Sequence, residues 1–457
     1  MISGHLKDIT SLLRAELIGS DGKFLGVSTD SRKIEAGQLF VALRGPHFDG
    51  HKFLTEAASC GASAALVDTP ADIPMPQVRV PDTLRALGDL ASDWRGRFDI
   101  PVIGVTGSFG KTTVKEMLAR ILTQGRSALV TRGNLNNEIG VPLTLFGMAA
   151  RNQSAVIEMG ANHAGEIARL CAIAAPNIGL VTVAGACHLE GFGSLEGVAR
   201  AKGEMFKTLP ADGTAVINAD DSFAGLWRQF AGDHAVTSFG LGPTADYTAR
   251  EIQRVADDEL RFLLVCPEGE ASVRLALAGR HNVMNALAAA ATAAQAGATL
   301  EQVVAGLESM TPVAGRMQLL RTFAGGRLVD DSYNASPRTV KAGLDYLCEL
   351  PGRPWAALGD MGELGEHGPE LHGEIGRYAR SVGIERLFVL GPLSERTAAA
   401  FGSGALHFFD PVSLGAALSE ELDADVNVLV KGSRMMRMEQ VVQALATPAL
   451  ANAGGGF

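Results

Sequence analysis

The segment Gly-Val-Thr-Gly-Ser-Phe-Gly-Lys-Thr-Thr at residues 104–113 constrains the fold more than any other part of the chain. An apolar run that begins at residue 100 continues into this segment as far as Val105. After the segment, apolar residues recur at the spacing of one helix face. That face carries Val114, Met117, Leu118, Ile121 and Leu122. The pattern predicts a buried strand, a glycine-rich turn and a helix, an arrangement that binds phosphate through backbone N–H groups and the helix N-terminus.

The turn departs from the strict Walker pattern, because Val105 stands where that pattern has its first glycine. The flanking strand and helix still favour a nucleotide site over an ordinary strand–turn–helix with a surface lysine. We expect Lys111 to reach the β- and γ-phosphates and Thr112 to offer its hydroxyl to Mg²⁺. The predicted nucleotide contacts in the turn are Gly107, Ser108, Gly110, Lys111, Thr112 and Thr113.

Three residues outside the turn are weaker candidates. Glu158 ends the apolar run 154–160, and an acidic group at the carboxyl edge of a parallel sheet is suited to bind a metal. Taken alone, such a glutamate is more often a solvated or capping residue. His188 lies in a predicted loop and Lys202 on a predicted helix, and by themselves both are unremarkable.

Composition narrows the class of protein. The chain has 457 residues, 47% of them hydrophobic and 20% charged, which predicts a globular protein of about three domains. The formal charge of -10 disfavours nucleic acid as a partner. The first 13 residues lack the apolar core of an export signal, and the Ala-rich run 285–298 is typical of a packed helix rather than a membrane span. The cysteines show no CxxC spacing, which favours reduced thiols in a cytoplasmic protein: Cys60, Cys171, Cys187, Cys266 and Cys348.

Strand and helix patterns divide the chain into three α/β segments, 1–98, 99–312 and 313–457. In the second segment strands alternate with helices, which predicts a parallel sheet covered on both faces, with an antiparallel excursion at 246–266. The predicted strands of the first segment are 37–43 and 63–68, followed by a helix at 82–97. Those of the second are 100–107, 127–130, 154–160, 177–185 and 213–220. Those of the third are 325–333, 353–361, 385–391 and 426–433.

Several further motifs together resemble the Mur ligases, ATP-dependent amide-forming enzymes of peptidoglycan precursor synthesis. They are Asn-Leu-Asn-Asn-Glu-Ile-Gly (134–140), His-Leu-Glu-Gly-Phe-Gly-Ser (188–194), Ala-Lys-Gly-Glu (201–204), Gly-Arg-His-Asn (279–282), Asp-Asp-Ser-Tyr-Asn-Ala-Ser-Pro (330–337) and Leu-Gly-Asp-Met-Gly-Glu-Leu-Gly (358–365). The resemblance covers nearly the whole chain, and the family's phosphate turn usually has the shorter form seen here. The last two motifs are similar to those of the branch that joins D-alanyl-D-alanine to UDP-N-acetylmuramoyl-tripeptide, which implies those two substrates.

The resemblance also implies an architecture and a set of nucleotide and metal ligands. The three segments would be a UDP-binding domain, a central P-loop ATPase domain and a C-terminal Rossmann-like domain. Thr112 and Glu158 would hold one Mg²⁺, and His188 would hold a second together with a carbamylated Lys202. Around ATP, Asn282 would contact the adenine, Arg316 the phosphates and Asp331 the ribose, with Asn334 and Tyr333 near the nucleotide or the amine. The implied catalytic residues are Lys111, His188, Lys202 and Arg316.

The same resemblance implies two groups of substrate contacts. The contacts to the uridine diphosphate would be Ser28, Asp30, Ser31 and Arg32. Without the resemblance, these residues are simply typical of a turn. Asn134, Asn136 and Asn137 would meet the muramoyl peptide, although alone they read as polar loop residues.

The implied reaction activates the peptide carboxylate as an acyl phosphate before the amine attacks, and the residues leave the general base unassigned. We expect the third segment to close on the second when nucleotide binds. A sibling Mur ligase, a folylpolyglutamate-type ligase, a nucleotide switch and a non-catalytic P-loop module remain as alternatives. A GTP-dependent switch is disfavoured, because the chain has no Asn-Lys-x-Asp guanine motif. The modest charge and the lack of heptads predict a monomer.

Overall fold

The computed structural model describes residues 1–46 and 48–447, so the last ten residues of the predicted third segment lie outside the described part. The chain forms two compact units. Among the described residues, the first comprises 1–183, 200–247 and 288–306, and the second comprises 184–199, 248–287 and 307–447. Both units are mixed α/β structures, as the strand and helix patterns predict.

A six-stranded parallel sheet is the centre of the first unit. Its strand order is β11 (Ala128–Val130), β12 (Ser154–Glu158), β10 (Val102–Thr106), β13 (Ile178–Val181), β14 (Thr214–Asn218) and β15 (Ala235–Phe239). The helices that contact its strands include α4 (Lys111–Leu122), α5 (Gly140–Leu145), α6 (Glu166–Ala174) and α9 (Ala224–Ala231). The predicted parallel sheet is thereby confirmed, with β15 as a strand that the sequence patterns did not indicate.

The strand order places a topological switch point at β10. This strand pairs with β12 on one side and β13 on the other, so the chain winds away from β10 in both directions. In open parallel sheets, ligands bind outside the carboxyl ends of the strands at such a point. The phosphate turn follows β10 there, Glu158 ends β12, and Thr182 follows β13.

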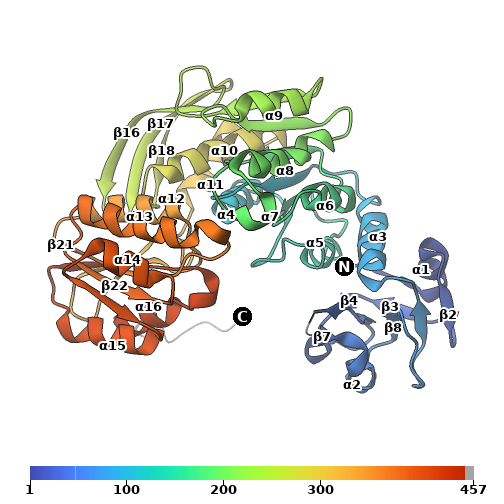
Figure 1. Cartoon of the computed structure of the whole chain (residues 1–457). Coiled ribbons are helices and arrows are strands. Elements are labelled where there is room, and N and C mark those ends of the chain that lie inside the picture. Colours follow the sequence, from blue (N-terminus) through green and yellow to red (C-terminus); the bar gives the residue numbers. More distant parts are fainter. Residues whose placement is uncertain (47, 448–457) are drawn as a thin grey trace. The chain divides into compact units, whose positions relative to one another are not determined.

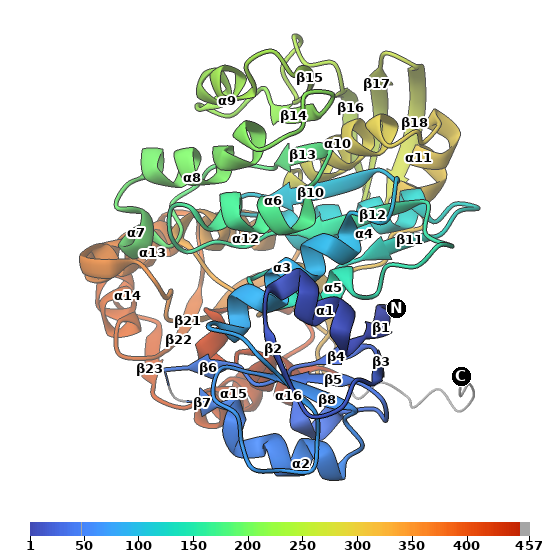
Figure 2. The ribbon, with the colours of Figure 1, turned by 90° about the vertical axis from the view of Figure 1, so that its right-hand side faces the viewer.

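The N-terminal part of the first unit contains a smaller sheet. Its order is β2 (Glu16–Ile18), β9 (Gln77–Arg79), β8 (Ala64–Val67), β5 (Leu39–Val41) and β4 (Val27–Ser28), with only the β2–β9 pair antiparallel. Apolar side chains of β5, β8 and α2 (Leu54–Ser59) form its core. The helix α3 (Thr83–Arg95) contacts α1 (Leu6–Leu13), α5 and α6 (Figure 2). The remaining strands form two short antiparallel pairs, β1 (Ser3–His5) with β3 (Lys23–Leu25) and β6 (Arg44–Gly45) with β7 (Phe48–Asp49).

The second unit is built on another six-stranded sheet. Its order is β19 (Gln318–Arg321), β20 (Arg327–Asp331), β24 (Val426–Lys431), β21 (Arg353–Gly359), β22 (Arg386–Leu390) and β23 (Ala405–Phe408), all parallel except β19. One apolar core lies between this sheet and α12 (Pro337–Glu349), α13 (Gly368–Ser381) and α14 (Ser394–Phe401). A second core lies under α15 (Pro411–Glu421) and α16 (Glu439–Leu445), so helices cover both faces (Figure 1).

The predicted antiparallel excursion is a three-stranded sheet of the second unit. It consists of β16 (Thr248–Ala256), β17 (Glu259–Cys266) and β18 (Gly269–Leu275). The Ala-rich segment that follows is α10 (His281–Gln295), and after it comes α11 (Leu300–Glu308). Within residues 1–46 and 48–447, no helix combines the length and the apolar character that crossing a bilayer requires.

Candidate functional site

The phosphate turn has a backbone that only glycine can follow at Gly107. Its φ is +142°, and an added Cβ would lie 2.0 Å from the Thr182 hydroxyl oxygen, far inside contact distance. The Thr182 hydroxyl also donates to the Phe109 carbonyl at 2.6 Å, and the Ser108 N–H donates to the Val183 carbonyl at 2.8 Å. The loop after β13 therefore fastens the turn after β10, which fixes where the turn's N–H groups point.

The turn ends at Gly110, whose φ of +80° starts α4 at Lys111. The predicted ligands Thr112 and Thr113 are half-buried in the first turn of this helix. The Lys111 Nζ donates to the carbonyl of Gly107 at 2.6 Å, so this lysine lies folded along the turn. The helix N-terminus and one ammonium group are thus directed at the same loop, which favours anionic ligands there.

Glu158 is a buried carboxylate, 2% exposed, at the end of the strand beside the phosphate turn. Its Oε1 accepts a hydrogen bond from Asn136 Nδ2 at 2.8 Å, and its backbone N–H donates to the Thr131 hydroxyl at 3.0 Å. Its Oε2 has no hydrogen-bond partner among the described residues. A carboxylate with one oxygen held and the other uncommitted suits a hard divalent cation, so the residues present fit a Mg²⁺ ligand.

The three predicted asparagines have different environments. Asn136 holds Glu158, and its carbonyl also accepts from the Gly160 N–H at 2.8 Å. Asn137 accepts from the N–H groups of Ile139 and Gly140, at 3.2 and 2.9 Å, and so caps the start of α5. Asn134 is exposed. The Asn137 side chain therefore has a structural role that its sequence pattern did not reveal.

Lys202 is buried at 1% exposure on α8 (Leu195–Lys207). Its Nζ donates to the carbonyl of Ala161 at 3.0 Å, in the loop that follows Glu158. Two residues later, Glu204 accepts from the N–H groups of Gly165 and Ala168 at 2.7 and 3.1 Å, at the start of α6. The helix α8 therefore holds the loop after β12 at two points, one of them Lys202.

His188 is in the second unit, so its predicted pairing with Lys202 stays a prediction. It precedes the short helix α7 (Leu189–Phe192) in a left-handed conformation, with φ at 50°. Its Nδ1 lies 2.6 Å from Glu363 Oε2, and this contact holds the pKa of Glu363 below its ordinary value. Across the described ranges, no three His, Cys, Asp or Glu side chains are grouped as a metal site would require.

The predicted ribose ligand Asp331 forms a buried ion pair that sequence reasoning missed. Lys431, 3% exposed at the end of β24, donates to Asp331 Oδ2 at 2.5 Å and to the Asn334 carbonyl at 2.8 Å. The other oxygen, Asp331 Oδ1, accepts from the Met317 N–H at 3.2 Å. One lysine thus ties together two of the predicted nucleotide contacts.

Arg316 lies next to this pair in the chain that precedes β19. Its guanidinium carbon is 4.2 Å from the centre of the Tyr333 ring, a cation–π contact. The neighbouring Gly315 N–H donates to Asp330 Oδ2 at 3.1 Å. The structure therefore brings Arg316, Tyr333 and Asp331 together within the second unit.

Asn282, the predicted adenine contact, is 4% exposed near the start of α10. Its Nδ2 donates to the Ala278 carbonyl at 2.7 Å, and its Oδ1 accepts from Asn285 at 2.9 Å. Both ends of its amide are therefore engaged in local hydrogen bonds.

The predicted uridine-diphosphate loop is organised by Asp30. This residue accepts from the Arg32 N–H and holds the guanidinium of Arg32 in a two-point contact, with both distances 2.9 Å. That hydrogen bonding lowers the pKa of Asp30. The Ser28 hydroxyl donates to the Asp30 carbonyl at 3.1 Å, and Ser31 is buried at 8% exposure. The four predicted residues thus form one compact loop with an exposed arginine.

The motif at 358–365 has a clear structural function. Asp360, at the end of β21, accepts from the Ser394 N–H and hydroxyl at 2.7 and 2.6 Å, and from the Leu393 N–H at 3.1 Å. It therefore caps the start of α14. Gly391 must lack a side chain, because an added Cβ would lie 2.5 Å from the Asp360 carboxyl carbon.

Two buried lysines, Lys115 and Lys431, were not predicted as part of any site. Lys431 ends a mostly apolar strand pattern that only Asn427 interrupts, and a charge at that position is a usable signal for a site at the sheet edge. Lys115 lies on α4 with its Nζ 3.9 Å from Glu158 Oε2. Nothing in the helical pattern distinguishes it from a surface lysine.

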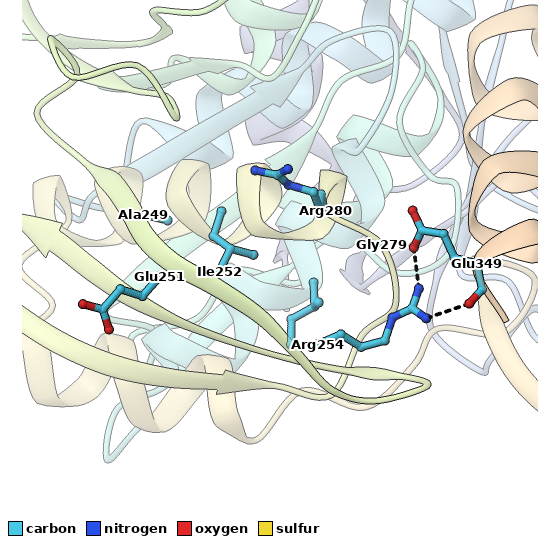
Figure 3. Close-up of a pocket in the computed structure, with 8 residues that line it drawn as sticks. Ala249, Glu251, Ile252, Arg254, Gly279, Arg280 and Glu349 are labelled. Atoms are coloured by element: carbon cyan, nitrogen blue, oxygen red, sulfur yellow. Dashed lines mark hydrogen bonds and ion pairs between the residues drawn. The ribbon is translucent and has the colours of Figure 1, made fainter. Parts of the chain in front are cut away.

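A pocket of about 360 Å³ lies elsewhere in the second unit, between β16 and the start of α10 (Figure 3). Its wall includes Arg254, Arg280, Glu251 and Glu349. Arg254 is ion-paired with Glu349 and also donates to that residue's carbonyl at 3.2 Å, so this cation is already neutralised within the wall.

Comparisons with known proteins cover nearly the whole chain. Three family models match it: "Mur ligase family, catalytic domain" at 23–95, "Mur ligase middle domain" at 105–293 and "Mur ligase, glutamate ligase domain" at 315–434. The UDP-N-acetylmuramoyl-tripeptide–D-alanyl-D-alanine ligase of Escherichia coli is 44% identical over 97% of this chain and 99% of its own length.

Solved structures agree with these matches. A crystal structure of MurF from Acinetobacter baumannii has a TM-score of 0.90 at 33% identity, covering 96% of this chain and 97% of that one. MurF from Thermotoga maritima in complex with ADP has a TM-score of 0.81 at 29% identity, covering 92% and 96%. On the family matches and the extent of identity, this chain belongs to the Mur ligase family.

Proposed function

We propose that this chain is an ATP-dependent ligase that joins D-alanyl-D-alanine to UDP-N-acetylmuramoyl-tripeptide in peptidoglycan precursor synthesis. Curated relatives similar over nearly the full length are named for that activity. The observation that carries the proposal is Glu158, a buried carboxylate with an uncommitted oxygen, which pairs across the strands with Val105 just before the phosphate turn. A metal ligand beside a phosphate turn at a sheet switch point suits phosphoryl transfer.

The chemistry explains why such a site is needed. A carboxylate and an amine do not condense in water, so the peptide carboxylate first attacks the γ-phosphorus of ATP, and an acyl phosphate and ADP form. The amine of D-alanyl-D-alanine then attacks the acyl carbon, and phosphate leaves. The first step brings two anions together, so the positive charges of Lys111 and Arg316 would stabilise it by position.

Thr112 and Glu158 would hold the Mg²⁺, which when bound neutralises charge on the phosphates. Carbamylated Lys202 and His188 would hold a second ion, and the buried position of Lys202 beside the loop after Glu158 supports its part in this assignment. Incubation with ¹³C-bicarbonate should give a carbamate signal by NMR that Lys202→Arg abolishes. A spectrum that is the same for both proteins would contradict the carbamate.

The other ligand assignments are part of the same proposal. The nucleotide would also contact Gly107, Ser108, Gly110 and Thr113 in the turn, and Asn282, Asp331 and Asn334 elsewhere. Ser28, Asp30, Ser31 and Arg32 would bind the uridine diphosphate. Asn134, Asn136 and Asn137 would meet the muramoyl peptide. We place the enzyme in the cytoplasm as a monomer, with domains at 1–98, 99–312 and 313–457.

A phosphate-release assay with UDP-N-acetylmuramoyl-tripeptide and a panel of amines tests the reaction. We expect turnover with D-alanyl-D-alanine, dependent on ATP and Mg²⁺, and loss of turnover in Glu158→Gln. Turnover with free amino acids and none with the dipeptide would favour a sibling ligase. Nucleotide binding with no phosphate release for any amine would favour a binding module.

We also propose that the third domain closes on the second when nucleotide binds, because an acyl phosphate must be kept from water. Small-angle scattering should show a smaller radius of gyration at saturating ATP analogue. An unchanged radius would contradict closure.

A further inference from the structure

Lys115 is a buried ammonium group that the proposed reaction does not use. It lies one helical turn after Lys111 on α4, which packs against β12 (Figure 2), and its side chain is 1% exposed. Its Nζ lies 2.9 Å from Glu116 Oε1, 3.9 Å from Glu158 Oε2 and 3.5 Å from the carbonyl of Gly133. A cation removed from water needs such acceptors nearby, because an unpaired buried charge is costly.

Glu158 has the complementary requirement. Its carboxylate is as deeply buried as Lys115, and Asn136 satisfies only Oε1. The ammonium of Lys115 is too far from Oε2 for a hydrogen bond but close enough for a strong Coulombic attraction at low dielectric. Lys115 thus pairs most closely with Glu116, which is 39% exposed and screened by water, and it also attracts the buried Glu158 at longer range while it leaves Oε2 open.

A divalent cation on Oε2 would meet the ammonium at short range. The two cations repel each other, and among the described residues Glu158 is the only buried carboxylate beside them, because Glu116 is 39% exposed and screened by water. Phosphates bound in the adjacent turn would supply the missing negative charge. The metal is thus disfavoured when it arrives alone and favoured when it arrives with a nucleotide.

We propose that Lys115 is the resident counter-ion of Glu158 and makes binding of the metal at Glu158 depend on the nucleotide. This inference rests on the proposed function for its assignment of Glu158 as a metal ligand. Lys115 acts through Glu158 and is a positioning residue rather than a catalytic one.

The test is direct binding of Mn²⁺ to the full chain, measured by the loss of the free-ion electron paramagnetic resonance signal with and without ADP. In the unmutated protein, we expect Mn²⁺ to bind Glu158 weakly alone and at least tenfold more tightly with ADP. Lys115→Met should tighten binding of Mn²⁺ alone by about tenfold, or about 1.4 kcal/mol. Lys115→Arg keeps the charge and should leave it unchanged.

Mn²⁺ binding that is lost in Glu158→Gln is binding at this site. In the double variant Lys115→Met/Glu158→Gln, the tighter Mn²⁺ binding caused by Lys115→Met should vanish. Binding of Mn²⁺ alone that is no tighter in folded Lys115→Met than in the unmutated protein would overturn the inference. If Lys115→Met does not fold, the unmutated protein still tests the inference. Equal Mn²⁺ affinity at Glu158 with and without ADP would overturn the inference as well.

The outcomes separate this inference from the proposed function. Mn²⁺ binding with ADP that is unaffected by Glu158→Gln would overturn the metal assignment itself, and the inference with it. Ligase turnover with the dipeptide is measured independently and survives a failure of the Lys115 inference.

Discussion

Removing either partner of the Asp331–Lys431 pair should destabilise the second unit, and removing both should cost less than the sum. Their side chains are 13% and 3% exposed, and the two charged atoms are 2.5 Å apart. Loss of one partner of a buried ion pair typically costs 3–5 kcal/mol. We expect about 3 kcal/mol for Asp331→Asn, at the lower end of that range, because Lys431 keeps the Asn334 carbonyl.

Lys431→Met should cost less, about 2 kcal/mol, because Asp331 retains some access to water and the N–H group of Met317. The double variant buries no unpaired charge, so we expect a total near 3 kcal/mol and a coupling energy of about 2 kcal/mol. This coupling energy measures the interaction between Asp331 and Lys431, whereas each single-variant cost also includes the loss of other contacts.

The assay is urea unfolding followed by the fluorescence of Trp355, which is 2% exposed and pairs with Val428 on the strand that carries Lys431. The chain has three tryptophans, so Trp94→Phe and Trp227→Phe make Trp355 the sole reporter of this unit. Single-variant costs that add without coupling, to within about 0.5 kcal/mol, would refute the pairing.

Three further predictions follow from the contacts described. Gly107→Ala should weaken ADP binding by about 100-fold in a fluorescence titration, because its Cβ would overlap a neighbouring hydroxyl, whereas Gly225→Ala meets no atom within 4 Å at an ordinary φ and should leave ADP binding nearly unchanged; equal losses would argue against the steric reasoning. Iodoacetamide at pH 8 should label the exposed Cys60 but not Cys171, whose pKa burial raises to about 12, and mass spectrometry showing equal labelling would contradict this. Asn137→Ala should lower the free energy of unfolding by about 1 kcal/mol by removing a helix cap, and Asn137→Asp should restore it, while an unchanged stability for both would exclude the cap.

The elements that the sequence predicts correctly have strong local patterns. The apolar stripe of α4 is buried as expected, from Val114 to Leu122. The central strands of both large sheets are largely apolar, because helices cover both faces. The patterns missed the short strands of the N-terminal part, including β9, which lies between β2 and β8, and they missed β18. Three further missed strands, β15, β19 and β23, lie at sheet edges and are only partly buried. Their residues carry a weaker apolar signal than those of central strands.

The candidate site shows the same division. The phosphate turn could be predicted because the backbone at Gly107 has no room for a side chain, so the sequence must have glycine there. The environments of Lys115 and Lys431 could not be predicted, since each depends on a carboxylate that the chain supplies from a distant strand. The pairing of His188 with Glu363 likewise joins segments far apart in the chain. Contacts of this kind follow from topology, which no local pattern contains.

The central claim is that the γ-phosphoryl group of ATP passes to the bound peptide carboxylate before the amide forms. It is tested most directly with UDP-N-acetylmuramoyl-tripeptide labelled with ¹⁸O in its terminal carboxylate. The account predicts that ¹⁸O appears in inorganic phosphate in step with the formation of the D-alanyl-D-alanine product. Product formation with unlabelled phosphate would contradict it.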